Sequence, residues 1–414
     1  MKTICLNFRV HQPLLLRQHN STGMGYDDSY FDEVKNRNLI LRLATNCYLP
    51  ANKILLNIIN NYKGLFKVSF SISGTTIDQL KLYAPEVIDS FVRLSETGCV
   101  EFLSETYSHS LAVLRNKDEF CKQIRNHSAT IENLFGTKPR IFANTNLIYS
   151  DEIGATLCEL GYEGVLAEGP KTIAGIKCPN FIYHQTKQSG IKVLFRNKKL
   201  SEDISNRFSD YTWSGWPINA NRFVSKLQRN DPEEKIVNLF LNYAAFGEQH
   251  KFGSGIFRFL CEFPPAVFRN KDIVFSTPSE IITNYEPASI MPVIYPALCS
   301  DNRENLRPWI GNGIQQEAFE KLYGLSDLID TTNDHRLVSD WENLQASDHF
   351  YFMSTRTNPD SRLQTSHNPY SNPFDAFMNY MNVINDLTYR LCLQRKERLS
   401  GGLPKINWKP NSEK

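Results

Sequence analysis

Apolar and polar residues alternate in short stretches, separated by longer stretches of helical periodicity. In residues 3–10, Ile4, Leu6, Phe8 and Val10 occupy every second position, which is typical of a strand with one buried face. Further strands are predicted at 67–73, 100–110, 140–146, 163–169, 190–197, 235–243 and 272–278. Strands that alternate with helices favour right-handed βαβ units and a parallel sheet. About seven or eight such units favour a closed or nearly closed barrel.

Helix start and stop signals lie between these strands. The helical patterns at 85–98 and 117–136 end on Gly98 and Gly136, as left-handed helix caps commonly do. A further helix is expected to begin at Ser150, directly after the strand that ends on Asn144-Thr145-Asn146.

The pattern changes beyond Pro296, where at least three helical stretches follow one another. Residues 1–295 are therefore expected to form an α/β barrel and residues 296–400 a helical region packed on it. Residues 401–414 show no periodicity and are expected to form a mobile tail.

Composition narrows the class of protein. The 414 residues carry 46 Lys and Arg against 44 Asp and Glu, so no nucleic-acid partner is implied. None of the nine cysteines forms a CxxC pair, which favours reduced thiols in a cytoplasmic protein. The start turns polar within seven residues and no apolar run approaches 18 residues, so neither a signal peptide nor a membrane segment is expected.

Several cofactor and catalytic motifs are absent from the sequence. No GxGxxG or GxxxxGK[ST] follows a strand, which argues against nucleotide binding. No two of the nine histidines are three or four positions apart, so neither HExxH nor HxxxH occurs and no metal site is expected. There is no GxSxG either, so the sequence lacks the best signal for a serine esterase. We expect no cofactor.

Polar residues gather instead at the predicted carboxyl ends of the strands, where parallel barrels carry their chemistry. Within the predicted strand 100–110, Glu105, Tyr107 and His109 alternate, so all three are expected on one face. A shared binding cleft is predicted from the polar strand ends, which include His11, Gln12, Glu105, Tyr107, His109, Asn144, Asn146, Glu168, Asn242 and Glu248.

Five of these stretches together resemble the sequence regions of glycoside hydrolase family 57, specifically its α-amylase group. They read HQP, VEFLSETYSHSL, RIFANTNLIYSDEIG, LFRNKKLSEDISNRFS with WSGWP, and NYAAFGEQH, and DHFYFMST resembles the C-terminal part of that group. The resemblance implies an incomplete (β/α)7 TIM-like barrel with a helical C-terminal region. It also implies action on α-glucans, including maltooligosaccharides, by a retaining mechanism without a metal.

A retaining glycosidase needs two carboxyl groups about 5–5.5 Å apart, one as nucleophile and one as acid/base. The family nucleophile is a glutamate in a motif like NTELIY, and this chain has Asn146 at that position. An amide can hydrogen-bond to a sugar but cannot form the glycosyl ester. The LSDDI-like stretch of the family implies Asp203 as acid/base, with Glu202 as the alternative.

This chain also departs from the DYETFGEH-like motif of the family, because Asn242 and Ala244 replace two acidic groups. Loss of a nucleophile typically costs a factor on the order of 10⁴ to 10⁶ in turnover. The resemblance therefore implies an α-amylase-like protein that retains a glucan cleft and has impaired or no hydrolysis.

Three functions remain open. The first is α-glucan binding with catalysis impaired or lost. The second is an active hydrolase or 4-α-glucanotransferase in which Glu105, Glu168 or Glu248 supplies the missing carboxylate. The third is a scaffold without sugar affinity.

Two further expectations concern the sugar itself. Trp213 and Trp216 are expected to border the cleft, because indoles stack on the apolar faces of sugar rings. His11 and Glu105 are expected to hydrogen-bond to sugar hydroxyls rather than to hold a metal.

Overall fold

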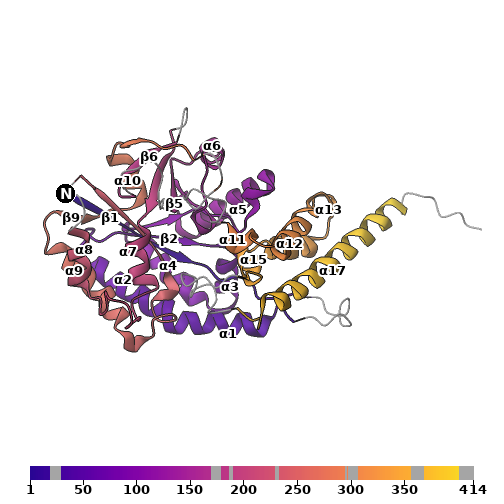
Figure 1. Cartoon of the computed structure of the whole chain (residues 1–414), viewed down its shortest axis with the longest axis horizontal. Helices are drawn as coiled ribbons and strands as arrows, with labels where there is room; N and C mark the ends of the chain where they lie inside the picture. Colours follow the sequence, from indigo (N-terminus) through magenta and orange to yellow (C-terminus); the bar gives the residue numbers. More distant parts are fainter. Residues whose placement is uncertain are drawn as a thin grey trace, which may run out of the picture.

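The computed structural model describes residues 1–18, 29–168, 179–185, 190–228, 233–293, 296, 306–355 and 368–400 (Figure 1). The predicted tail at 401–414 lies outside these ranges. The strands are β1 Lys2–Val10, β2 Val68–Ile72, β3 Val100–Leu103, β4 Ile141–Ala143, β5 Gly164–Glu168, β6 Ile182–His184, β7 Lys192–Arg196, β8 Ile236–Asn242, β9 Ile273–Phe275 and β10 Ser289–Ile290. The helices before β10 are α1 Glu33–Leu43, α2 Leu49–Tyr62, α3 Gly74–Tyr83, α4 Pro85–Ser95, α5 Lys117–Phe135, α6 Asp151–Glu159, α7 Lys198–Ser205, α8 Ala220–Gln228, α9 Ile256–Phe268 and α10 Pro278–Asn284.

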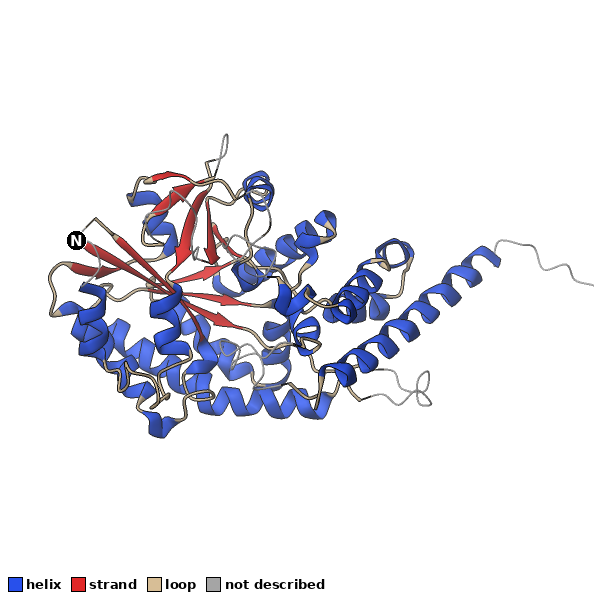
Figure 2. Ribbon diagram, viewed as in Figure 1, coloured by secondary structure: helices blue, strands red, loops and turns tan. Residues whose placement is uncertain are grey.

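The strands form two sheets whose orders are β3-β2-β1-β8, with β9 also paired to β1, and β10-β6-β7-β5-β4 (Figure 2). All pairings are parallel except β6 with β7. A parallel bridge between Ser104 and Phe142 joins β3 to β4. On the other side, the Asn197 amide donates to the Asn238 carbonyl at 2.7 Å and joins β7 to β8.

Because this bridge and this backbone hydrogen bond connect the two sheets, the strands form an incomplete ring of β1, β2, β3, β4, β5, β7 and β8. The fold is therefore the incomplete (β/α)7 barrel predicted from the sequence, with its helices outside (Figure 2).

Alternation along β1 separates two environments. Ile4, Leu6 and Phe8 belong to the large apolar cluster that includes the surrounding helices, whereas Cys5 belongs to a second cluster between the strands. Asn7 lies on the same side as Cys5 and donates to Asn238 of β8 at 2.6 Å. Because side chains alternate along a strand, Arg9 lies on the same inner side as Cys5 and Asn7, at the carboxyl end of β1.

Every described element after β10 is a helix. These helices are α11 Arg307–Ile310, α12 Gly313–Tyr323, α13 Ser326–Thr331, α14 His335–Leu344, α15 Ser347–Phe352 and α17 Pro373–Ser400. Trp309, Phe319, Trp341 and Phe350 from this region are buried in the same apolar cluster as the barrel helices. In the described ranges no helix is both long and apolar enough to cross a membrane.

The strands predicted at 100–110 and 140–146 both end earlier in the structure, and the second is followed by a 3-10 helix at Thr145–Leu147. β3 ends at Leu103, and residues 105–109 form an irregular turn instead of continuing the strand predicted at 100–110. His109 has a φ of 52°, which a strand cannot accommodate. The prediction that Glu105, Tyr107 and His109 share one strand face is therefore wrong.

Candidate active site at the carboxyl ends of the strands

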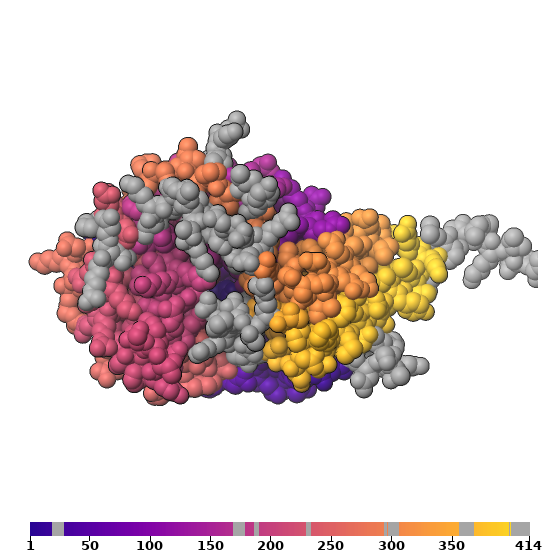
Figure 3. Space-filling view, in the orientation of Figure 1, coloured from indigo at the N-terminus to yellow at the C-terminus, as the bar shows by residue number. Residues whose placement is uncertain are grey.

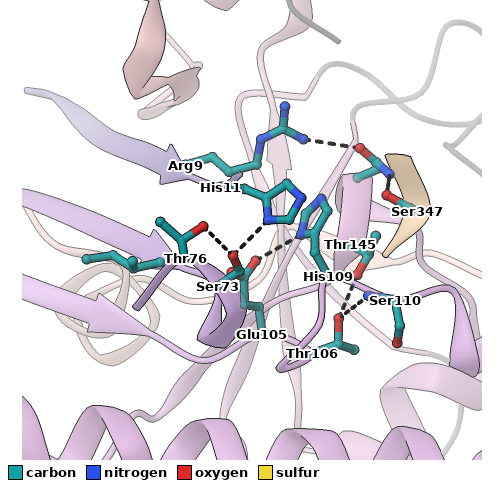
Figure 4. A network of polar contacts seen from close by, with 12 residues as sticks. Arg9, His11, Ser73, Thr76, Glu105, Thr106, His109, Ser110, Thr145 and Ser347 are labelled. Carbon is teal, nitrogen blue, oxygen red and sulfur yellow. Dashed lines mark hydrogen bonds and ion pairs between the residues drawn. The ribbon is translucent and has the colours of Figure 1, made fainter. Parts of the chain in front are cut away.

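A polar network occupies the barrel rim where several strands end (Figure 4). Arg9 and His11 come from the end of β1, and Ser73 follows β2. Glu105 and His109 lie in the turn after β3, and Asn146 follows β4. Ser347 and Asp348 reach the same place from α15, so the helical region completes the rim.

His11 is held at both ring nitrogens. Its Nδ1 lies 2.7 Å from the Ser73 hydroxyl and its Nε2 lies 2.8 Å from Asp348 Oδ2. Burial acts to raise the pKa of Asp348, but the charge and hydrogen bond of His11, with help from His109 and Arg9, bring it well below its usual range. With both nitrogens engaged, His11 can bind a sugar hydroxyl only by exchanging a partner.

A second imidazole is stacked on His11. The ring centroids of His11 and His109 are 4.0 Å apart, and His109 Nδ1 lies 3.3 Å from Glu105 Oε2. Burial, followed by the charges of His11 and Arg9, lowers the pKa of His109 well below its ordinary value. Burial also raises the pKa of Glu105, although the nearby His127 and His11 oppose that rise. Glu105 Oε1 and His109 Nε2 are buried and make no hydrogen bond with the described residues.

Tyr107 is directed away from this network. Its ring covers Gly74 so closely that a Cβ there would lie 2.5 Å from the ring, and its hydroxyl donates to Asp78 of α3 at 2.8 Å. Tyr107 therefore ties the turn after β3 to α3, while Glu105 and His109 face the rim. The backbone turn, and not strand alternation, separates these roles.

Asn146 lies between the barrel and the helical region. Its Oδ1 accepts a hydrogen bond from Arg9 at 3.1 Å, and its amide nitrogen donates to Ser347 at 3.3 Å. Asn146 and the following Leu147 have φ values of 52° and 58°. Asparagine tolerates this left-handed region better than most non-glycine residues, so the backbone suits the amide that the sequence supplies.

The remaining strand ends add one ion pair and one amide. Arg196 at the end of β7 donates to Glu168 at the end of β5 at 3.0 Å, and its Nε donates to the Phe240 carbonyl at 3.0 Å. Asn242 at the end of β8 is directly opposite Arg9 in the parallel register, and its side chain accepts from the Ala244 amide. Positions 146 and 242 thus both adjoin Arg9.

Asp203 and Glu202 lie on α7 and not at a strand end. Asp203 is buried and accepts ion pairs from Lys226 at 2.7 Å and Arg207 at 3.1 Å. Glu202 is paired with Arg207 at 2.9 Å. Through Lys226 of α8, Asp203 ties α7 to α8, whereas Glu202 is bound within α7 and to the loop that follows it, by Lys198 and Arg207.

The other predicted residues are spread around the site. Glu248 forms ion pairs with Arg42 and Lys251, and the side-chain oxygen of the buried Gln12 has no hydrogen-bond partner among the described residues. The indole of Trp213 packs under Lys226, whose Nζ lies 4.5 Å from the ring centroid. Trp216 is 47% exposed, so of the two indoles it is the one available for stacking.

The donor set does not fit a metal centre. Within the described ranges, no group of three or more His, Cys, Asp or Glu side chains is arranged to hold an ion. The carboxylates at the rim are instead bound by nitrogen donors: Asp348 by His11, Glu105 by His109 and Glu168 by Arg196. Such a rim can donate and accept many hydrogen bonds, but it presents no carboxylate at position 146.

Sequence reasoning missed Arg9, Ser73, Ser347 and Asp348. A signal for Arg9 was present, because Asn7 and Arg9 are polar on the inner side of an otherwise apolar strand. Asp348 lies in a stretch noted only for its resemblance, and nothing local to that stretch shows that it meets His11. A hollow opens on this face of the molecule between the barrel surface and the orange and yellow helical region, with indigo atoms from the start of the chain at its floor (Figure 3).

Fold and site together define a (β/α)-barrel protein with a polar rim at the carboxyl ends of its strands. The chain belongs to one family in particular, because the family model described as glycosyl hydrolase family 57 matches residues 5–294. A protein of Methanocaldococcus jannaschii with the name "Putative alpha-amylase" is 32% identical over 398 residues, covering 93% of this chain and 84% of that protein.

Two solved structures have the same fold. The branching enzyme of Pyrococcus horikoshii superposes with a TM-score of 0.70 at 13% identity, covering 97% of this chain and 92% of the other. The alpha-amylase AmyC of Thermotoga maritima gives a TM-score of 0.63 at 14% identity, with 98% of each chain covered.

Proposed function

We propose that this protein binds α-glucan or maltooligosaccharide chains at the barrel rim and has impaired or no hydrolytic activity. The observation that carries the proposal is Asn146, whose amide is fixed between Arg9 and Ser347 where the family resemblance places the nucleophile. The similar proteins that are named as amylases or branching enzymes support a glucan as the ligand. The cytoplasmic location inferred from the sequence stays a prediction.

The second candidate is an active hydrolase or glucanotransferase with a relocated carboxylate. It has one specific observation in its favour, because Glu105 and Glu168 each keep a buried carboxylate oxygen without a hydrogen-bond partner in the described structure. Both residues are nevertheless tied through the other oxygen to an imidazole or a guanidinium, which limits their freedom to attack a sugar.

Affinity electrophoresis in glycogen or amylose gels, combined with reducing-end release from amylose, tests the proposal. We expect polysaccharide to retard the wild type, with little or no release of reducing ends. Glu105→Gln should weaken the retardation, whereas Glu163→Gln, which removes an exposed ion pair with Arg140 at the opposite end of the barrel, should not. Absence of retardation would favour the scaffold, and rapid release would favour the relocated carboxylate.

A further inference from the structure

The 28-residue helix α17 has an exposed apolar face. It runs along one edge of the molecule and packs against α12, α13, α14 and α15 (Figure 1). Ala376, Tyr380, Ile384, Leu387 and Leu391 are buried on the packed side. Phe374, Met378, Tyr389 and Leu393 are 60%, 56%, 62% and 39% exposed. Since successive helical residues are rotated by about 100°, these four side chains lie within an arc of about 100°, on the side away from the body.

The four exposed side chains are arranged symmetrically along the helix. Phe374 lies as far before the midpoint between Val383 and Ile384 as Leu393 lies after it. The same midpoint relates Met378 to Tyr389, and it relates Asn382 to Asn385 at the centre of the face. A sequence with this symmetry fits an antiparallel copy of itself, because a two-fold axis requires that residue i contacts j while j contacts i.

We propose that α17 is the interface of a two-fold symmetric dimer of this chain. The two helices pair antiparallel, so Phe374 faces Leu393 of the other copy and Met378 faces its Tyr389. Asn382 and Asn385 face each other at the axis, where an asparagine pair can hydrogen-bond and fix the register. The arrangement is independent of the proposed glucan function.

Charge supports the antiparallel orientation. Asp375 lies in the first turn of α17, whereas Arg395 and Lys396 lie near its last turns. An antiparallel partner brings the acidic turn of one copy close to the basic turns of the other, and a parallel partner would bring like charges together. The apolar face runs over 20 residues from Phe374 to Leu393, a length of about 28 Å. A single pair of helices of this length buries less area than a standard interface of about 1,600 Å². We therefore expect a concentration-dependent equilibrium between monomer and dimer.

Sedimentation equilibrium over a range of protein concentrations tests the interface. The mass of the wild type should rise from 47.6 kDa towards twice that value as concentration increases. The variant carrying both Met378→Glu and Tyr389→Glu places like charges opposite each other and should dimerise at least about a hundredfold more weakly. Leu82→Glu, which changes an apolar residue on α3 that is 69% exposed, is the control and should leave the dimer unchanged.

The register has its own test. Combining Met378→Lys with Tyr389→Glu in one chain makes each facing pair oppositely charged, so this variant should dimerise again. In a Cys392→Ser background, Met378→Cys and Tyr389→Cys chains should crosslink when mixed, but neither should crosslink alone. Two copies of position 378 would be about 16 Å apart in this register.

A wild type that stays monomeric at every concentration would overturn the proposal, including the case in which residues 401–414 cover the face instead. The proposal would also be overturned if the double-glutamate variant dimerised as strongly as the wild type. If the charge-swapped variant is as monomeric as the double-glutamate variant while both keep the wild-type circular dichroism spectrum, the antiparallel register is wrong.

Discussion

Asn146 combines a constrained backbone with a polar side chain that two neighbours hold in place. Its left-handed φ favours asparagine over longer side chains, and Arg9 donates to its oxygen as it could to a carboxylate. The inner side of β1 thus retains a cation beside a position that carries no charge. Asn242, directly opposite Arg9 on β8, is a second uncharged residue beside this cation.

This geometry gives a prediction for restored chemistry. Asn146→Glu introduces a carboxylate that can pair with Arg9, at a backbone cost of about 1 kcal/mol because of the positive φ. We expect weak maltooligosaccharide cleavage at best, and more than additive improvement when Asn242→Asp and Ala244→Glu are added. Cleavage should be measured at equal folded concentration, with Asn146→Gln as the uncharged control of matched size.

Two outcomes would contradict the lost-nucleophile account. One is strong cleavage by the wild type that Glu105→Gln or Glu248→Gln abolishes, which would assign the role to a relocated carboxylate. The other is equal cleavage by the Asn146→Gln and Asn146→Glu variants, since the amide cannot form a glycosyl ester.

His349, next to Asp348 on α15, gives a prediction for pH. Burial lowers its pKa to about 4, and the charge of Asp348 opposes that shift only in part. The unfolded chain binds this proton near pH 6.5, so between pH 6.5 and 4 it holds more protons than the native state. The free energy of unfolding should therefore fall with falling pH in this window, by on the order of 3 kcal/mol from His349 alone.

Urea unfolding at several pH values measures this dependence. His349→Phe should flatten the slope between pH 6.5 and 4, whereas Phe352→Leu on the same helix should lower stability without changing the slope. An unchanged slope in His349→Phe would show that other buried histidines, such as His109, carry the effect.

At the scale of elements, the loop between α7 and α8 separates two tryptophans that look alike in the sequence. Trp213 packs under Lys226 and Arg207, the cations that hold Asp203, while Trp216 is half exposed. We expect Trp216→Ala to lower glucan affinity with little change in Tm. Trp213→Ala should lower Tm, because it uncovers the ion pairs that join α7 to α8.

Glucan titrations and thermal melts of both variants distinguish these roles. If Trp216→Ala unfolds the protein, the residue is structural and the stacking platform fails. If Trp213→Ala weakens binding at an unchanged Tm, the two roles are reversed.

At the scale of the whole molecule, the helical region and the barrel share one apolar cluster and one polar rim. Phe350 and Trp341 are buried in the cluster that contains Phe8, and Asp348 is bonded to His11. We therefore expect a single cooperative unfolding transition in calorimetry, and residues 1–295 alone should not fold stably. Two resolved transitions would instead support independent units at the boundary inferred from the sequence.

The sequence by itself predicted much of the fold because period-two alternation and glycine caps are local signals. The strand at Lys2–Val10 and the helix at Lys117–Phe135 fall within a residue of their predicted bounds. The turn after β3 could not be predicted this way, because Glu105, Tyr107 and His109 alternate as in a strand. Their path depends on Gly74, His127 and the neighbouring helices, which are distant in sequence.

In the candidate site, too, some features follow from the sequence alone and others only from the tertiary structure. The sequence alone determined that an amide stands at position 146 and that polar residues end the strands, since both are properties of residue identity. Only the tertiary structure decided that Asp348 binds His11 from 337 positions away and that Asp203 turns to Lys226. Such pairings depend on which surfaces fold against each other, because a carboxylate's partner is set by distance in space and by burial from water.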